Sequence, residues 1–423
     1  MGKSIKLEKV YDNYEKGWNG RMKEGELPET QQKVTYPHPN KPGEMTSQNY
    51  IEYADLAVVV LVRKGKKGQF EFGLVEQEAP AFIYDENDEK TEKGYHGILL
   101  EALSFALPQK DELPEDMSTW VEDHILDMGL EMEGFASLDD SKTALVQSFT
   151  NQNARFYVAG ISGEEQDRED KMHWFPMSSL ESYLDMQRKG GEEGVHSSIL
   201  TLYPLEQLRN KYRMQIKNMQ STKFSLDREL PQLQLVDKKV TNPSYRFNIV
   251  EASYINSKDG KEKVATYLTS YSNAGNAILM TQDNQNMFLS PQQRSPYLAE
   301  GEEIKTEVAG GLAEGRPYDV AATAELSEEQ GFHTDSIEEF TGPLAAVPFN
   351  SELSKAYMAH YEKGTEGEQN LDEQEKIGQK RAIPFKTLKE NLHDSKIPLT
   401  TKYYIMLKAR DLEQEKEKNQ EER

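Results

Sequence analysis

The sequence predicts an α/β fold in which one layout of strands and helices occurs twice along the chain. A β-rich hairpin, a helix ended by glycine, and a later series of strand, proline and helix recur in the same order. The offset between the copies drifts between about 200 and 220 residues, as it does when loops vary and elements do not. A chain of 423 residues is also too long for a typical single core and suggests about two or three domains.

The first repeated element is a hairpin. In each copy two short runs rich in apolar residues are separated by turn residues, which is typical of paired strands. The runs are Leu56–Val62 and Phe70–Val75 in the first copy, and Ala277–Met280 and Met287–Leu289 in the second.

The elements after the hairpin also recur in pairs. Each copy has a predicted helix stopped by glycine, then a strand, a short helix opened by proline, and a last helix. In chain order these are Thr119–Gly129 and Ala321–Gly331, Arg155–Ala159 and Lys355–Ala359, the helices after Pro176 and Pro384, and the helices near Ser198–Leu208 and Thr401–Leu412.

These pairs divide the chain into four segments. Residues 1–217 are predicted to form the first domain, 218–244 a polar linker, and 245–412 the second domain. Residues 413–423 are a run of charges, which predicts a frayed helix end or disorder.

Composition excludes several classes of function. The chain has 50 Lys and Arg against 73 Asp and Glu, a net charge of −23, which argues against binding to a nucleic-acid backbone. The longest apolar run, Leu56–Val62, is too short for a membrane helix. The absence of cysteine excludes disulfides, thiolate metal sites and a cysteine nucleophile. The first residues lack an apolar signal segment, so the expected location is the cytoplasm.

The segment that starts at Gly310 carries the predicted chemistry. A glycine turn leads into a helix that bears Glu325, Glu328 and Glu329, and spacings of three and four residues put these carboxylates on one helical face. Like charges so placed repel unless a cation lies between them, and hard oxygen ligands suit Mg²⁺ or Mn²⁺. Gly310 can bring a backbone carbonyl close to such an ion. The alternative is that the glutamates only solvate a surface helix.

This segment resembles the signature box of the Nudix hydrolases. The box is a glycine, five residues, Glu, seven residues, then Arg-Glu-apolar-x-Glu-Glu-x-Gly-apolar. The chain matches it at Gly310, Glu325, Leu326, Glu328, Glu329, Gly331 and Phe332. It departs at Arg316, where the family has Glu, and at Ala324, where the family has Arg.

The resemblance implies two tandem Nudix-like α/β/α sandwiches with mixed sheets. Members of the family hydrolyse nucleoside diphosphates linked to another moiety by attack of water on phosphorus, with metal held by the box glutamates. Carried over by position, Glu325, Glu328, Glu329 and the Gly310 carbonyl would bind metal, and Glu325 and Glu329 would be catalytic. The two departures leave two outcomes open, which are hydrolysis with altered metal geometry or nucleotide binding without turnover.

Features outside the box resemble the ADP-ribose pyrophosphatase branch of the family. They are Gln292–Pro296 at a strand end, Glu307–Gly311 leading into the box, and Pro348–Glu352 after it. The resemblance implies that Arg294 and Glu352 bind substrate. It also implies a further catalytic or metal-binding glutamate in the acidic loop Glu366–Glu375. Glu373 and Glu375 are the candidates, and Glu373 is taken as the catalytic one. The substrate class is then ADP-ribose or a nucleotide sugar.

The first copy lacks most of the metal ligands. When Gly129 is aligned with the closing glycine of the box, Pro108 takes the place of the opening glycine. Asp123 and Asp127 then remain on one face, and Leu126 replaces a glutamate. No catalytic metal cluster is therefore expected in this copy. Enzymes of the ADP-ribose branch commonly form homodimers, so we expect the two copies to form an intramolecular pseudo-dimer. A scaffold without catalysis, or a component of a larger assembly, is the alternative.

Overall fold

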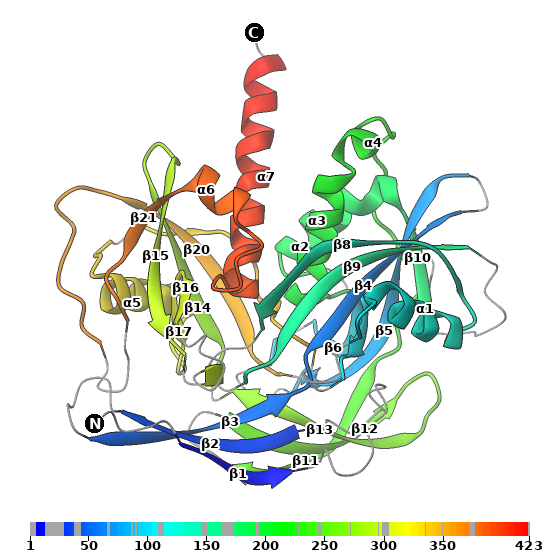
Figure 1. The fold of residues 1–423 in the computed structure, drawn as a ribbon, viewed down its shortest axis with the longest axis horizontal. Coiled ribbons are helices and arrows are strands. Elements are labelled where there is room, and N and C mark those ends of the chain that lie inside the picture. Colours follow the sequence, from blue (N-terminus) through cyan, green and yellow to red (C-terminus); the bar gives the residue numbers. More distant parts are fainter. Residues whose placement is uncertain are drawn as a thin grey trace.

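The computed structural model describes residues 6–421, apart from 13–28, 38–43, 66–67, 86–87, 89–90, 93, 109–113, 146–149, 163–171, 192–193, 227, 244–246, 271, 295, 298–303, 335, 349 and 372–376. Figure 1 shows two sheet-and-helix halves side by side above two small sheets. The predicted α/β fold class is confirmed, because each half contains a mixed sheet flanked by helices.

The first half is built on a seven-stranded sheet with the order β10-β5-β4-β9-β8, in which β6 also pairs with β5 and β7 with β4. Strands β4 and β9 are parallel and their other neighbours are antiparallel. The strands are β4 (Leu56–Lys64), β5 (Phe70–Ile83), β6 (His96–Glu101), β7 (Leu103–Ala106), β8 (Glu131–Ala144), β9 (Asn153–Ser162) and β10 (Met172–Pro176). The helices are α1 (Met117–Asp127), α2 (Leu180–Arg188), α3 (Ile199–Lys211) and α4 (Arg213–Lys217), with a 3₁₀ turn, η3, at Met177–Ser179.

The second half repeats this plan in an eight-stranded sheet with the order β16-β15-β14-β20-β18, to which β17, β19 and β21 add through β14, β20 and β15. Its strands are β14 (Ala274–Thr281), β15 (Asn286–Gln293), β16 (Ile304–Glu307), β17 (Ala309–Leu312), β18 (Glu338–Glu339), β19 (Leu344–Ala345), β20 (Leu353–Tyr361) and β21 (Arg381–Pro384). Its helices are α5 (Tyr318–Gln330), α6 (Phe385–Glu390) and α7 (Leu399–Glu421).

The strands of the two sheets are paired in the same register. This register corrects the predicted alignment of Pro108 with the opening glycine of the box. On β4, Val58 lies opposite Ser104 of β7, and on β14, Asn276 lies opposite Gly310 of β17. Ser104, not Pro108, therefore occupies the place of the opening glycine. The alignment by helix ends was wrong because 25 residues separate Ser104 from Gly129, whereas 21 separate Gly310 from Gly331.

Each half is preceded by a three-stranded antiparallel sheet. The first consists of β1 (Lys6–Asp12), β2 (Glu29–Pro37) and β3 (Met45–Tyr53), and the second of β11 (Leu233–Pro243), β12 (Phe247–Asn256) and β13 (Glu262–Ser270). Strand β11 falls within the segment expected to be a linker. It is a strand because Leu233 and Leu235 pack with Ile83, Ile98 and Tyr254 in one apolar cluster.

The small sheet β11–β13 packs against the first half and not only against its own. Phe82 and Leu99 of the first half share a buried cluster with Val250 and Tyr267 of this sheet. Residues far apart in sequence therefore form one core, and the second copy covers the β5–β6 hairpin of the first.

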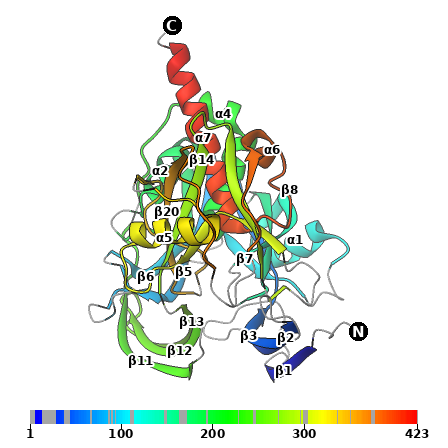
Figure 2. The ribbon, with the colours of Figure 1, turned by 90° about the vertical axis from the view of Figure 1, so that its left-hand side faces the viewer.

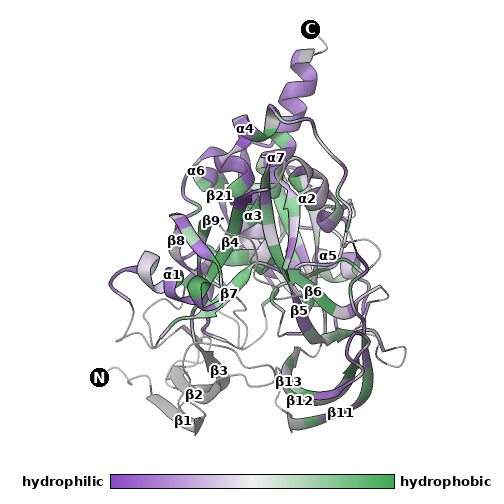
Figure 3. Cartoon of the chain, turned by 90° about the vertical axis from the view of Figure 1, so that its right-hand side faces the viewer, coloured by the Kyte–Doolittle hydropathy of each residue, from purple (hydrophilic) through white to green (hydrophobic). Residues whose placement is uncertain are grey.

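The two halves also meet along helices α3 and α7, which lie side by side at the centre of the molecule (Figure 1). Tyr203 of α3 and Tyr403 of α7 belong to the same apolar core. Beyond this contact α7 continues as a polar helix, and Figure 3 shows its far end to be hydrophilic. Most of the predicted tail, residues 413–421, is thus the end of α7.

No helix among the described residues is both long enough and apolar enough to cross a membrane.

Candidate functional site

Helix α5 carries the three predicted glutamates and lies across the second sheet, in front of β14 and β20 (Figure 2). Gly275 of β14 allows this close approach, because a Cβ there would lie 2.5 Å from the Tyr318 carbonyl oxygen. Ala322 and Leu326 pack beneath the helix against the sheet. The helix ends at Gly331, whose φ of 57° is left-handed and favours glycine.

Glu329 is the most enclosed of the three carboxylates, with only 3% of its surface exposed. Its Oε1 accepts a hydrogen bond from the Gln292 side-chain amide at 2.9 Å, and its Oε2 accepts one from the Gly310 backbone N–H at 3.0 Å. Burial raises its pKa well above the usual value. The negative charge of Glu325 raises the pKa further, and the positive charge of Arg294 opposes the shift. The last turn of α5 is thus tied to β15 and β17.

Glu325 lies one turn earlier and rests on the backbone of Gly311. A Cβ at Gly311 would overlap the Glu325 carboxylate, so glycine leaves the room that this side chain fills. Because the charge of Glu325 raises the pKa of Glu329, the two carboxylates are electrostatic neighbours. Their oxygen atoms are the ligand type that Mg²⁺ and Mn²⁺ prefer.

Glu328 is partly buried, and its backbone carbonyl accepts a hydrogen bond from the Asn370 N–H. Within the described ranges no three Asp, Glu or His side chains form a group that could hold a metal ion. What the structure does bring together is Glu325 and Glu329, which influence each other electrostatically. The assignment of Glu325, Glu328, Glu329 and the Gly310 carbonyl as metal ligands stays a prediction.

The two residues that depart from the box lie before and within α5, Arg316 in the preceding loop and Ala324 in the helix. Arg316 donates from its Nε to the Ala313 carbonyl at 3.1 Å and from an Nη to the Leu312 carbonyl at 3.2 Å. These bonds brace the loop before α5. The side chain of Ala324 has no polar group, so it cannot donate a hydrogen bond to Glu325 as an arginine could.

Arg294 forms a two-pronged ion pair with Glu307, with both N···O distances at 2.7 Å. Two parallel hydrogen bonds fix the plane of the guanidinium. Its charge reaches both Glu329 and Glu352, since it favours the ionised form of each. The structure thus brings Arg294 and Glu352 into the electrostatic surroundings of the box.

Glu352 has an unusual protonation equilibrium. Loss of hydration raises its pKa to about 7, against a lowering effect of a hydrogen bond with Ser270 and the charge of Arg294. Near neutral pH it is divided between its two forms, so it can donate or accept a hydrogen bond. Glu373 lies outside the described residues.

Two residues that hold this site together were not among the predicted site residues. Gln292 fixes Glu329, and Glu307 fixes Arg294. Both stand in segments that the sequence singled out, Gln292–Pro296 and Glu307–Gly311. Their place in those segments could have marked them as site residues. Which side chain each one binds could not be predicted, because that depends on which strands are neighbours.

The corresponding helix of the first half, α1, presents a different surface. Asp123 and Asp127 are exposed, and Leu126 is 60% exposed. His124 lies 2.8 Å through its Nδ1 from the Trp120 carbonyl oxygen. Glu101, the counterpart of Glu307 by sheet register, instead accepts hydrogen bonds at the start of α3.

Comparison with solved structures gave a partial likeness, whereas two other comparisons found no match. No known family model and no curated protein matches the chain. Among solved structures, the chain is similar to one described as an ADP compounds hydrolase, with 16% sequence identity, a TM-score of 0.35, and coverage of 45% of this chain and 98% of that one. A likeness at this level does not establish membership of a family.

Proposed function

We propose that the second half hydrolyses a nucleoside diphosphate linked to another moiety, of the ADP-ribose or nucleotide-sugar class. The observation that carries this proposal is the pair of the buried Glu329 and the half-buried Glu325, held beside the glycines that open the box. Two carboxylates in one partly buried place repel each other, and a divalent cation relieves that repulsion.

Glu325, Glu328, Glu329 and the Gly310 carbonyl would hold Mg²⁺ or Mn²⁺, which would neutralise the diphosphate and make bound water a better nucleophile. Gln292 and the Gly310 N–H orient the Glu329 carboxylate before substrate arrives. Such preorganisation lowers the cost of reaching the transition state.

Arg294 and Glu352 are proposed to bind the substrate. A guanidinium suits phosphate oxygens because it donates in a planar fork, and Glu307 keeps Arg294 in one orientation. Glu352 can hydrogen-bond a ribose hydroxyl in either direction, since its pKa is about 7. A local cation is needed because the whole chain has a net charge of −23 and repels anions at long range.

The test is release of AMP from ADP-ribose in the presence of Mg²⁺ or Mn²⁺, with wild type compared with Glu329→Gln. We expect the variant to lose about 10²–10³-fold in kcat, because removing one preorganised group that stabilises the transition state typically costs that much. Asp127→Asn, at the corresponding position of α1, is the matched control and is expected to keep the wild-type rate. Equal rates for wild type and Glu329→Gln would place the chemistry elsewhere.

A second candidate function is nucleotide binding without turnover. It is favoured by Ala324, which removes a support for Glu325, and by Arg316, whose guanidinium is engaged with loop carbonyls. Calorimetric binding of ADP-ribose to wild type, together with no AMP release under either metal, would select this candidate.

We further propose that the two halves form an intramolecular pseudo-dimer in the cytoplasm, one half catalytic and the other structural. The proposal is supported by two ion pairs between them, one half-buried and one buried. Arg188 of α2 pairs with Asp411 of α7, and Arg410 of α7 pairs with Glu206 of α3 at 2.7 Å. The buried pair Arg410–Glu206 needs a matched charge from each half, because a single charge left there would be uncompensated.

A further inference from the structure

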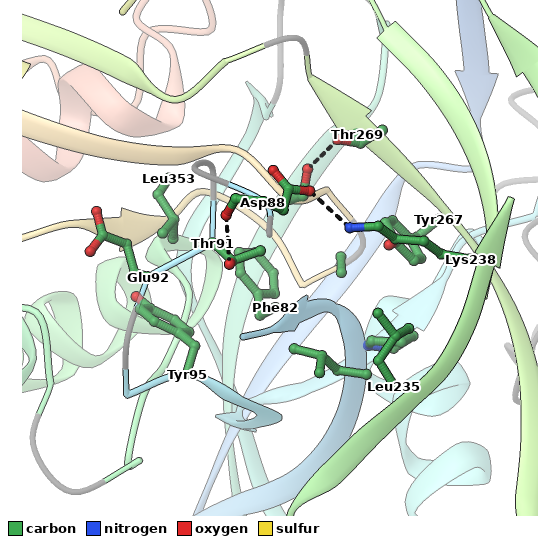
Figure 4. Close-up of a pocket in the computed structure, with 14 residues that line it drawn as sticks. Phe82, Asp88, Thr91, Glu92, Tyr95, Leu235, Lys238, Tyr267, Thr269 and Leu353 are labelled. Carbon is green, nitrogen blue, oxygen red and sulfur yellow. Dashed lines mark hydrogen bonds and ion pairs between the residues drawn. The ribbon is translucent and has the colours of Figure 1, made fainter. Parts of the chain in front are cut away.

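The loop between β5 and β6 of the first half reaches across to the second half. Its residues Asp88, Thr91, Glu92 and Tyr95 line a small hollow together with Lys238 and Tyr267, and Figure 4 shows Asp88 pointing toward Lys238. Lys238 Nζ lies 2.7 Å from an Asp85 carboxylate oxygen and 3.0 Å from one of Asp88. This bridge anchors the first part of the loop to β11.

The last part of the loop is anchored separately. The Tyr95 hydroxyl donates to the Pro343 carbonyl at 3.1 Å, and the Tyr95 ring stacks on His196 at a centroid distance of 3.7 Å. Pro343 belongs to the second half and His196 to the first. Glu92 lies between the two anchors, so its backbone is held in place from both sides.

Glu92 connects this loop to helix α5 by a hydrogen bond. The Tyr318 hydroxyl donates to Glu92 Oε1 at 3.1 Å, and Tyr318 is the first residue of α5. Burial raises the pKa of Tyr318, and the charge of Glu92 raises it further. The tyrosine therefore stays protonated and keeps donating to Glu92 at physiological pH.

The same hydroxyl connects to the loop that opens the box. The Asn273 side chain hydrogen-bonds the Tyr318 hydroxyl. Asn273 also accepts from the Ala313 N–H through its carbonyl at 2.7 Å and from the Leu353 N–H through its side chain at 3.1 Å. Tyr318 thus joins the first half to the segment between Gly311 and α5 and to the strand after Glu352.

We propose that Glu92 of the first half is a positioning residue for the second half, which sets the place of helix α5 through Tyr318. This inference rests on the proposed hydrolysis and names the part that the first half plays in it. Pro317, before the helix, makes no side-chain capping bond to the first turn, so the hydroxyl contact supplies an anchor that a cap would otherwise give. Because a helix moves as a rigid body, a shift of its first turn displaces Glu325 and Glu329.

The experiment compares wild type with Tyr318→Phe, Glu92→Ala and Glu92→Gln in the full chain. Two readouts are used, which are hydrogen exchange of the α5 amides and the kinetics of AMP release from ADP-ribose with Mg²⁺. We expect faster α5 exchange and about a tenfold lower kcat with KM nearly unchanged in the first two variants, since small misplacements cost rate more than binding. Glu92→Gln keeps an acceptor and is expected to restore both readouts to near wild type.

The matched control is Tyr254→Phe. Tyr254 donates to Glu78 at 2.8 Å and also joins the two halves, but away from α5. It should leave α5 exchange and kcat unchanged. The double variant Glu92→Ala with Tyr318→Phe should be no worse than either single variant, because both remove one shared bond.

Unchanged α5 exchange in both Tyr318→Phe and Glu92→Ala overturns the proposal, whatever happens to the rate. A lower kcat with unchanged exchange, or an equal effect from Tyr254→Phe, also overturns it. If wild type shows no hydrolysis but the two variants exchange faster, the positioning contact stands and the proposed function fails.

Discussion

At the scale of single residues, the buried carboxylates take different roles according to their hydrogen-bond partners. Glu329 accepts from two N–H groups at a sheet edge, whereas Glu101 accepts from the N–H and hydroxyl of Ser198 at 2.7 Å each and from the Thr201 hydroxyl. Glu329 thus belongs to the candidate site, and Glu101 fixes the start of α3. The box spacing predicted Glu325 and Glu329, but their partners depend on which strands are paired.

Glu101 predicts a pH dependence of stability. Burial raises its pKa from 4.5 to about 7 in the folded protein, so the folded state binds the proton more tightly than the unfolded state. Its contribution to the free energy of unfolding is therefore complete below pH 4.5 and is lost as the pH rises to about 7. The loss amounts to about 3 kcal/mol.

Chemical denaturation between pH 4 and 8 tests this expectation by comparing wild type with Glu101→Gln. The stability of wild type relative to the variant should fall across that interval, because glutamine cannot ionise. Parallel pH profiles for the two proteins would show that Glu101 does not titrate in this range.

At the scale of elements, the repeated helices and the central strands could be predicted because they carry strong apolar patterns and glycine stops. The predicted helix Ala321–Gly331 corresponds to α5, Tyr318–Gln330. Strand β11 could not be recognised, because Asp237, Lys238 and Lys239 interrupt its apolar pattern. Leu233 and Leu235 form an apolar face of this strand, which is recognised only from its packing against the first half.

Gly331 offers a test at this scale. Its φ of 57° is left-handed, and a Cβ there would lie 2.5 Å from the Gly367 carbonyl oxygen. Gly331→Ala should lower the free energy of unfolding by about 2–4 kcal/mol, from backbone strain and the clash together. Urea unfolding measures the loss.

Gly129→Ala is the control for backbone strain alone. Gly129 has a φ of 77° after α1, with no atom within 4 Å of an added Cβ, so about 1 kcal/mol is expected. If both variants lose the same free energy of unfolding, the segment around Gly367 in the acidic loop moves away from the added Cβ without an energetic penalty.

At the scale of the whole molecule, a buried lysine links the halves. Lys402 of α7 is 0% exposed. Its Nζ lies 2.9 Å from an Asp139 carboxylate oxygen, 3.0 Å from the Ser141 hydroxyl and 2.7 Å from the Thr143 hydroxyl, all on β8. Such a contact between residues 263 apart could not be read from spacing, because it depends on how the two halves pack.

Lys402→Met should destabilise the protein by about 3–5 kcal/mol, because it leaves the Asp139 charge buried without its partner. Adding Asp139→Leu should recover most of that loss. Scanning calorimetry measures both variants. Lys386→Met, which removes an exposed i,i+4 pair with Glu390, should shift stability little. A double variant as unstable as Lys402→Met would contradict the account.

The packing of α3 against α7 within one chain has a consequence for how the protein can change over generations. Two identical subunits meet only above a threshold concentration, and every mutation appears on both faces of their contact. Here the two halves belong to one chain, so they stay together at any dilution, and a mutation changes only one side of their contact. One copy can therefore lose its chemistry and specialise in supporting its neighbour, an asymmetry closed to a protein assembled from identical subunits.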